Sequence, residues 1–389
     1  MGDPGAATAL VVQRLEALWR NYTAISALNH YFPELLAETR DDPQRMAPAP
    51  THALPGYVCR VAYTSFALIS DTGAALLIDC GHDSVVDTLQ QWLESRRISA
   101  VEGCWVTHYH DDHVDALGRL VQAFGCPILA DQHLDEIIEH PGRFFLPCIS
   151  PNPAPVARAT REGESWPWHE FRLTAFHLPG QTYYHGGLLV EGHGEKLFFC
   201  GDSASPTGVD DYCAANRNFL GAGKGLRRCL EIWRELKPDH ILNQHQERAF
   251  AFADEHLAAM EAMLVGRERL LREMLPWEDP NFGLDEGWVR TDPFAQEAWP
   301  AGAVAVDVQL TNHGPEWVEA SVEPVLPEGW QWDRGRSTAQ VRVPPRSDGV
   351  ARVWLSPGAA PGRYVIPFRV TWGGRYLGQF RHAIVTVRH

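Results

Sequence analysis

The sequence predicts an α/β protein with a helical extension at its N-terminus and a separate all-β domain at its C-terminus. Three observations predict this organisation. Apolar residues recur at helical spacing near the start of the chain, short β-branched runs alternate with helical segments in its middle, and short strands alone follow. We therefore expect a helical extension at residues 1–56, an α/β domain at 57–275, a linker at 276–300 and a β domain at 301–389.

The N-terminal segment combines one amphipathic pattern with a proline-rich stretch. Between Ala6 and Tyr22 the apolar residues favour a helix that packs on another part of the protein. Any regular element after this helix is interrupted by prolines, namely Pro43, Pro48, Pro50 and Pro55. Residues 1–56 are therefore predicted to be an extension of the domain that follows.

The central segment begins with an extended run at residues 57–69, a turn at Asp71-Thr72-Gly73 and a strand at 74–78, which together predict a hairpin. A helix is expected after it, then a strand at 101–106, then a helix beyond His113. The same criteria predict further strands at 171–176, 188–190, 196–199 and 240–242, and helices at 224–236 and 253–274. The proline-rich residues 141–155 are expected to form an ordered loop that covers a site.

The C-terminal segment differs in kind, because it contains six or seven short strands separated by Gly, Pro and Asn turns and no helical pattern. This spacing predicts a β-sandwich of immunoglobulin type with a structural or docking role. Trp330, Trp332 and Trp372 are candidates for carbohydrate binding, although the core of a sandwich also needs tryptophan.

Composition narrows the functional classes. The 389 residues are 45% hydrophobic and carry a formal net charge of −15, and no basic run is present, which argues against nucleic-acid binding. The eight cysteines are scattered singly without a CxxC pair, so we expect buried free thiols and a reducing compartment. Neither a secretory signal nor an apolar run of membrane-spanning length is evident. We predict a cytoplasmic protein that acts on a small molecule and has no membrane partner.

One motif carries most of the functional information: Thr107-His108-Tyr109-His110-Asp111-Asp112-His113. It follows an apolar strand, where extended backbone directs the side chains of residues i and i+2 to the same side, so His108 and His110 can face one metal ion. Asp112 and His113 come at the start of the next helix. A metal site at this strand end is the prediction, and the alternative is a hydrated loop that is merely rich in His and Asp.

Four more pieces accompany the HxHxDH motif in a fixed order: Ile78-Asp79-Cys80-Gly81, Pro179-Gly180-Gln181-Thr182, Cys200-Gly201-Asp202 and Asn243-Gln244-His245. With these pieces the chain resembles the metallo-β-lactamase superfamily over residues 57–265. The resemblance implies an αββα sandwich with a one- or two-metal site at one edge.

The same resemblance implies a ligand set. His108 and His110 would bind one ion, Asp112, His113 and His245 the second, and Asp202 would bridge both. Two Zn²⁺ per chain are expected, with iron or manganese as the alternatives.

Gln181 departs from the family pattern, which usually has a histidine here to complete the first site. We expect His185 to replace it, and His177 and Gln181 itself are the alternatives. A neutral amide oxygen is a poorer zinc ligand than an imidazole, so without a replacement the first site is weakened.

The implied activity is hydrolysis of an ester, thioester, lactone or phosphoester by a metal-bound hydroxide, since two ions lower the pKa of a shared water to roughly 7. Asp112 is expected to orient the hydroxide, and Tyr183 or Tyr184 to donate to the developing oxyanion, unless these tyrosines only line a lid. Asp202 as a bridge resembles the glyoxalase II and lactonase groups more than true β-lactamases, in which a cysteine is common in the second site.

Several alternatives stay open. One set of polar residues lies between the two late ligands and either borders the pocket and grips an anionic substrate or forms a solvated helix face: Arg217, Asn218, Lys224, Arg227 and Arg228. The same ligands suit an iron enzyme of redox or oxygen chemistry. The departure at Gln181 also allows a non-catalytic binding protein with a degenerate site. No oligomeric state is predicted.

Overall fold

The computed structural model describes residues 46–210, 216–300, 302–332 and 338–389. The helix predicted between Ala6 and Tyr22 lies outside these residues. The described chain divides into two compact units. The first comprises the described residues up to Glu139 together with Pro147–Leu275, and the second comprises His140–Leu146 together with the described part of Pro276–His389.

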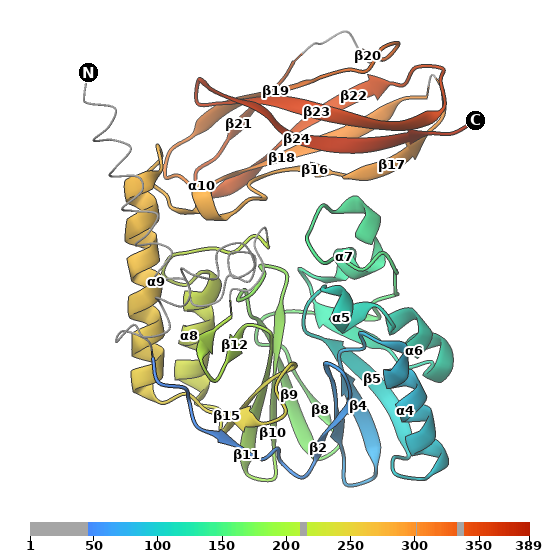
Figure 1. Ribbon diagram of the computed structural model, residues 1–389, viewed down its shortest axis with the longest axis vertical. Coiled ribbons are helices and arrows are strands. Elements are labelled where there is room, and N and C mark those ends of the chain that lie inside the picture. The colour runs from blue at the N-terminus through green and yellow to red at the C-terminus, as the bar shows by residue number, and fades with distance from the viewer. Residues whose placement is uncertain (1–45, 211–215, 301, 333–337) are drawn as a thin grey trace, which may run out of the picture. The chain divides into compact units, whose positions relative to one another are not determined.

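Two β-sheets lie face to face in the first unit, and helices cover their outer faces, so this unit has the αββα architecture (Figure 1). One sheet has the strand order β2-β3-β4-β5-β6-β7 and the other the order β1-β15-β14-β11-β10-β9-β8. The strands of the first sheet are β2 (Val58–Ala62), β3 (Ser65–Ile69), β4 (Ala74–Ile78), β5 (Ala100–Val106), β6 (Ile128–Asp131) and β7 (Arg158–Thr160). Those of the second are β1 (Thr51–His52), β8 (Ser165–Trp168), β9 (Phe171–His177), β10 (Gly186–Gly192), β11 (Glu195–Gly201), β14 (His240–Asn243) and β15 (Ala249–Phe250). A two-stranded ribbon adds β12 (Ala204–Ser205) and β13 (Gly208–Val209).

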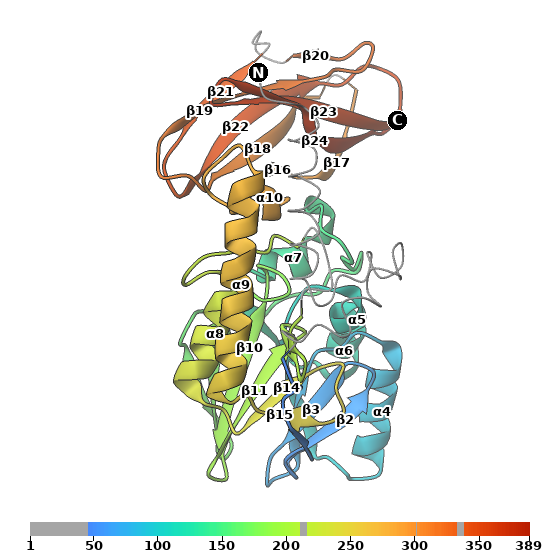
Figure 2. The ribbon, with the colours of Figure 1, turned by 60° about the vertical axis from the view of Figure 1, so that its left-hand side comes forward.

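The helices of this unit lie on opposite sides of the paired sheets. Figure 2 shows α8 and α9 beside the sheet of β10 and β11, and α4 and α6 beside the other sheet. Their bounds are α4 (Asp83–Glu94), α5 (Asp111–Val114), α6 (Leu117–Phe124), α7 (Asp135–Glu139), α8 (Gly225–Leu236) and α9 (Asp254–Met274). None of the helices that the structure describes is long and apolar enough to cross a membrane.

Alternation of side chains along the strands explains why the two sheets pack. Phe66 and Leu68 of β3 point to one face of their sheet, since residues two apart share a face. They are fully buried and belong to one apolar cluster with Leu173 of β9 and Phe199 of β11 in the opposite sheet. Burial of this shared interior is the main force that holds the two layers together.

The parallel strands determine where a site can form. β4, β5, β6 and β7 run parallel, and so do β11 and β14, so within each group the carboxyl ends meet at one edge of the sheet. Asp79 follows β4, His108 lies just after β5, Asp202 follows β11 and His245 lies just after β14. Loops at such carboxyl ends are where α/β folds place ligands.

Local turns of this unit differ from the prediction in one place. Residues 57–69 were expected to be one extended run, but they form the hairpin of β2 and β3, with Tyr63 in the left-handed region at φ 45°. No glycine or proline marks this turn, so pattern alone gives no signal for it.

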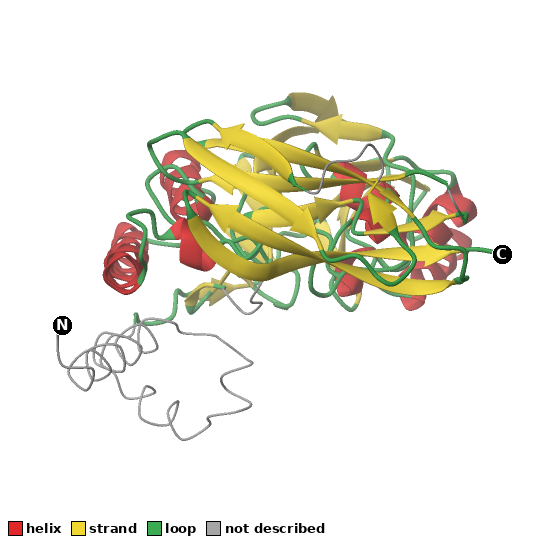
Figure 3. Cartoon of the chain, turned by 90° about the horizontal axis from the view of Figure 1, so that it is seen from above, coloured by secondary structure: helices red, strands yellow, loops and turns green. Residues whose placement is uncertain are grey.

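The second unit is built almost entirely of strands (Figure 3). One sheet has the order β16-β18-β22-β20 and the other β17-β24-β23-β19-β21, around a common apolar core. The strands are β16 (Val289–Asp292), β17 (Ala295–Ala298), β18 (Val304–Asn312), β19 (Val318–Pro324), β20 (Gln331–Trp332), β21 (Ala339–Val343), β22 (Ser347–Ser356), β23 (Gly362–Trp372) and β24 (Arg375–Val387). The described helical elements are α10 (Asn281–Leu284) and the 3₁₀ turn η1 (Pro141–Arg143). The immunoglobulin type of this sandwich stays a prediction.

Two expectations for this unit need correction. Residues 276–300 do not behave as a linker, because β16 pairs with β18 and β17 pairs with β24. β24 is distant in sequence, and the Pro-rich composition of residues 276–300 hides the two strands β16 and β17. The pattern therefore suggested a loop. Trp330 and Trp372 are buried in the core and present no open face to a carbohydrate.

Six of the described cysteines are free thiols, as expected. Cys80, Cys104, Cys126, Cys200 and Cys229 are buried, Cys59 is partly buried and Cys148 is exposed, which departs from the expectation that the thiols are buried.

Candidate metal centre

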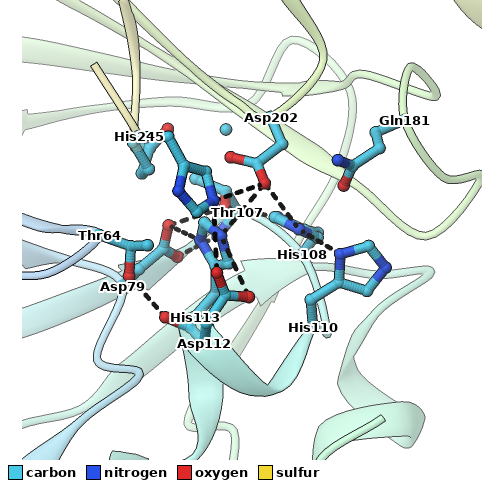
Figure 4. Close-up of polar contacts among 12 residues, drawn as sticks. Thr64, Asp79, Thr107, His108, His110, Asp112, His113, Gln181, Asp202 and His245 are labelled. Carbon is cyan, nitrogen blue, oxygen red and sulfur yellow. Dashed lines mark hydrogen bonds and ion pairs between the residues drawn. The ribbon is translucent and has the colours of Figure 1, made fainter. Parts of the chain in front are cut away.

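The strand ends bring the predicted second-site ligands to one point (Figure 4). Asp202 Oδ2 lies 3.4 Å from His113 Nε2 and 3.1 Å from His245 Nε2. Asp112 Oδ1 lies 3.6 Å from His113 Nε2, and Asp112 Oδ2 lies 3.3 Å from His245 Nε2. Donors about 2.0–2.1 Å from a tetrahedral zinc ion lie roughly 3.3 Å apart, so these separations suit one ion.

His108 and His110 form the adjacent part of the centre. His108 Nε2 lies 3.0 Å from His110 Nδ1 and 3.8 Å from Asp202 Oδ2. Asp202 thus faces both histidine groups, which is what a bridging carboxylate requires. In Figure 4 His110 and Gln181 lie on one side of Asp202 and His245 on the other.

Buried polar atoms without partners provide a test of whether these residues fit metal ions. Within the described residues, His113 Nε2, Asp202 Oδ1 and Gln181 Oε1 are buried and have no hydrogen-bond partner. Leaving such atoms unsatisfied costs about 1–3 kcal/mol each. A cation among them would satisfy lone pairs that the protein leaves open, so the donor set fits bound metal.

The charges in the centre also suit a cation. Burial opposes ionisation of Asp202, but His113 and His245 hold the pKa of that carboxyl well below its usual range. Burial and the neighbouring His113 and His110 hold the pKa of His108 well below its usual range, so its imidazole is neutral and keeps a lone pair. Hydrogen bonds to Asp112 and Asp202 raise the pKa of His245 to about 10, so an ion that binds there displaces a proton.

Asp79 is a functional residue that sequence reasoning did not assign. Its buried carboxylate accepts from Thr107 N at 2.7 Å and Thr107 Oγ1 at 2.8 Å, and lies 2.9 Å from His113 Nδ1. A carboxylate on the far nitrogen of a ligand histidine fixes the ring orientation and leaves Nε2 for the metal. Although burial opposes it, Asp202 and Asp79 together hold the pKa of His113 well above its ordinary value.

We expect Asp79→Asn to weaken metal binding about 10- to 100-fold. The amide has one NH₂ group in place of a carboxylate oxygen, so it no longer accepts all the hydrogen bonds from Thr107 and His113. The change is isosteric, so the fold should persist. Competition with a chromogenic chelator measures the effect. Asp71→Asn, in an exposed turn, is the matched control, and an affinity equal to wild type in Asp79→Asn would exclude the orienting role.

Gly81 allows the loop that carries Asp112 and His113 to approach β4. A Cβ atom at this position would lie 1.6 Å from Asp112 O and 2.7 Å from His113 N. Cys80 N donates to His113 O at 2.8 Å, which ties the two segments together. Only glycine fits here without displacing two predicted ligands.

Gln181 and His185 are the two candidates for the missing donor of the first site. Gln181 is buried, and its Oε1 has no partner within the described residues. Asn218 Nδ2 fixes the backbone of Gln181 by donating a 2.6 Å hydrogen bond to the Gln181 carbonyl oxygen. His185 is also buried, with neither ring nitrogen bonded within the described chain. Its ring lies parallel to that of His108, with centroids 4.8 Å apart and planes 11° apart.

Both residues therefore stay candidates for the donor of the first site, and the role predicted for His185 stays a prediction. His177, the other alternative, has its Nε2 2.8 Å from Tyr183 O.

The structure places the predicted tyrosines beside the centre. Tyr184 accepts a 3.1 Å hydrogen bond from Arg217 and meets Tyr109 edge to face, and Tyr109 in turn neighbours His110. Tyr183 packs on His177 and Phe219. Their catalytic role stays a prediction.

The polar residues considered for an anionic substrate separate into two groups. Arg227 forms ion pairs with Glu261 and Glu268, and Arg228 forms ion pairs with Glu162 and Glu231. Both arginines therefore take part in ion pairs on the surface of α8. Lys224 precedes that helix. Arg217 instead lies near the rings of Tyr183 and Tyr184.

Comparison with known proteins agrees with this geometry. Residues 60–227 match the family model of the Metallo-beta-lactamase superfamily. The chain is similar to a hydroxyacylglutathione hydrolase of Aeromonas hydrophila, with 31% identity over 172 residues, or 42% of this chain and 58% of that protein. It is also similar to a hydroxyacylglutathione hydrolase of Tolumonas auensis, with 25% identity over 187 residues, or 47% of this chain and 61% of that protein.

Among solved structures, the metallo-β-lactamase MIM-1 of Novosphingobium pentaromativorans is similar, with a TM-score of 0.43, 19% identity, and coverage of 58% of this chain and 91% of that one. The family match therefore covers residues 60–227, which lie within the first unit apart from residues 140–146. It spans 58% and 61% of the length of the first two curated relatives that it matches.

Proposed function

We propose that this protein is a metal-dependent hydrolase and that its substrates are acyl thioesters. The observation that supports the proposal is the convergence of His108, His113, His245 and Asp202 with buried, unpartnered donor atoms. Two Zn²⁺ ions are the proposed occupants, with iron and manganese as alternatives, and they would supply Lewis acidity and lower the pKa of water to about 7.

The protein's own residues have distinct tasks in this proposal. His108 and His110 would hold one ion, Asp112, His113 and His245 the other, and Asp202 both. Asp112 has a half-exposed carboxylate, so it is also placed to accept a proton from water that enters the centre. Asp79 keeps His113 oriented from behind.

The substrate class is inferred from two features. The relatives are called hydroxyacylglutathione hydrolases, and such a substrate is an anionic thioester. Arg217 donates to Tyr184, whose ring meets that of Tyr109 next to His110, so a guanidinium and a phenol can attract a carboxylate or a developing oxyanion there. These contacts support an anionic acyl compound over a neutral one.

A substrate panel tests the proposal. Zinc-loaded protein is assayed with a hydroxyacylglutathione, a simple ester, a lactone and a phosphodiester, before and after treatment with a chelator. Thioester cleavage that disappears with the metal supports the proposal. Cleavage of another member alone would keep the hydrolase and reject the thioester, and no metal-dependent cleavage would reject both.

A separate prediction concerns the first ion. Gln181→His should tighten metal binding at that site on the order of tenfold, or about 1.4 kcal/mol, because an imidazole is a better zinc ligand than a neutral amide. Stepwise metal titration by calorimetry measures it. His185→Ala is the matched variant: an unchanged affinity supports Gln181 as the donor, whereas loss of affinity in His185→Ala with no gain in Gln181→His would identify His185.

A further inference from the structure

A second group of metal-binding side chains lies outside the ligand set described above. Asp131 ends β6, His133 follows it by two residues, and His177 ends β9. Each side chain offers one ligand atom, and these atoms lie within 4.8 Å of one another. The sequence drew attention to His177 only as a substitute for Gln181, and to the other two residues not at all.

His177 is prepared to use one ring nitrogen as a ligand. Its Nε2 lies 2.8 Å from Tyr183 O, and a carbonyl oxygen can only accept, so Nε2 carries the proton and Nδ1 keeps its lone pair. Burial lowers the pKa of His177, which favours the neutral ring. A histidine whose second nitrogen donates to a backbone carbonyl is the usual arrangement behind a bound metal.

Asp131 supplies the second observation. It is completely buried, and its Oδ1 accepts from His133 N at 2.9 Å and lies 2.7 Å from His133 Nδ1. Its Oδ2 is buried and has no hydrogen-bond partner in the part of the chain that the structure describes. A buried carboxylate oxygen without a partner is costly, and a cation beside it would remove that cost.

The two histidines complete a compact arrangement over this carboxylate. The rings of His133 and His177 stack with centroids 4.2 Å apart, which brings the two imidazoles together beside Asp131. Ligand atoms of another trio, Asp71, Glu170 and His193, also lie within 4.8 Å of one another, but all three residues are exposed, so this trio serves as a control.

We propose that Asp131, His133 and His177 bind a divalent transition-metal ion, with Zn²⁺ as the expected occupant, at a site separate from the centre of His108 and Asp202. One carboxylate and two imidazoles suit zinc, and water completes such a set. The ion would join the end of β6 to the end of β9, from which the loop carrying Gln181 begins.

Zinc content of the full-length protein tests the site. The double variant His133→Gln/His177→Gln should contain about one equivalent of zinc less than wild type after identical loading and desalting. His193→Gln, in the exposed trio, should contain as much as wild type. Equal zinc in the double variant and wild type would overturn the proposal.

A second comparison separates this site from the proposed function. The variant His108→Ala/His113→Ala disables the main centre and should retain about one equivalent of zinc, which disappears when His133→Gln/His177→Gln is added. If the main-centre variant retains none, the further site is wrong while the hydrolase proposal stands.

Anomalous scattering at the zinc edge needs no variant, and so it is independent of any folding defect. Crystals of zinc-loaded wild-type protein should give a peak between Asp131, His133 and His177 in addition to those at the main centre. Peaks at the main centre alone would overturn the proposal.

Discussion

Replacing Asp202 by alanine is expected to remove most of the bound metal and to lower kcat/KM by about 10³-fold, because the charge stabilisation that it anchors is worth several kcal/mol. Asp202 Oδ2 lies within 3.8 Å of the Nε2 atoms of His108, His113 and His245. Its loss therefore affects both ions at once, whereas loss of Asp112 affects one. Metal analysis and steady-state kinetics on the same preparation measure the two effects.

The matched control is Asp87→Ala, which removes an exposed carboxylate paired with Arg119 on the surface of α4. A surface ion pair of this kind contributes about 0–1 kcal/mol, so metal content and activity should both stay at wild-type values. Asp202→Ala with full metal content and full activity would show that the cluster around Asp202 is not the reacting centre.

Gly81→Ala is expected to lower kcat/KM and metal affinity nearly as much as Asp202→Ala, although the added methyl group touches no proposed ligand atom. The added methyl group would meet the backbone of Asp112 and His113 at 1.6 and 2.7 Å, so that loop must move by more than an ångström. A displacement of about 1 Å costs roughly 10²-fold in rate when it misplaces reacting groups. Metal affinity should fall in parallel, because both residues are proposed ligands of one ion.

Gly118→Ala on α6 distinguishes this effect from a general intolerance of alanine. A Cβ atom there would have its nearest neighbour, Pro153 O, at an ordinary 3.6 Å. Alanine is also favoured over glycine within a helix by roughly 0.5–1 kcal/mol, so Gly118→Ala should be stable and fully active. Wild-type metal affinity in Gly81→Ala would contradict the close approach.

The architecture of the first unit was predictable because its information is local. Residues 74–78 and 101–106 are apolar runs of strand length, and the structure has strands over both. The metallo-β-lactamase resemblance was also accessible, since five short pieces of sequence carry it. What pattern could not give was pairing between distant segments. Residues 276–300 join β18 and β24, and residues 140–146 join the second unit, through contacts that no local periodicity records.

The candidate site was predictable to a similar extent. His108, His110, Asp112, His113, Asp202 and His245 were selected from spacing and resemblance, and the structure brings these six residues together. The supporting residues were not selected. Asp79 acts through a hydrogen bond to a residue 34 positions away, and Gly81 through the room it leaves, so neither has a signature of its own in the sequence.

The rate of thioester hydrolysis as metal is added back to metal-free protein tests directly whether the centre around Asp202 is catalytic. We predict no turnover without metal and a rate that rises as Zn²⁺ fills the centre around Asp202, with no such rise in Asp202→Ala. A rate independent of metal, or no hydrolysis of any ester, thioester, lactone or phosphodiester at full metal occupancy, would show that the protein is not a metal-dependent hydrolase.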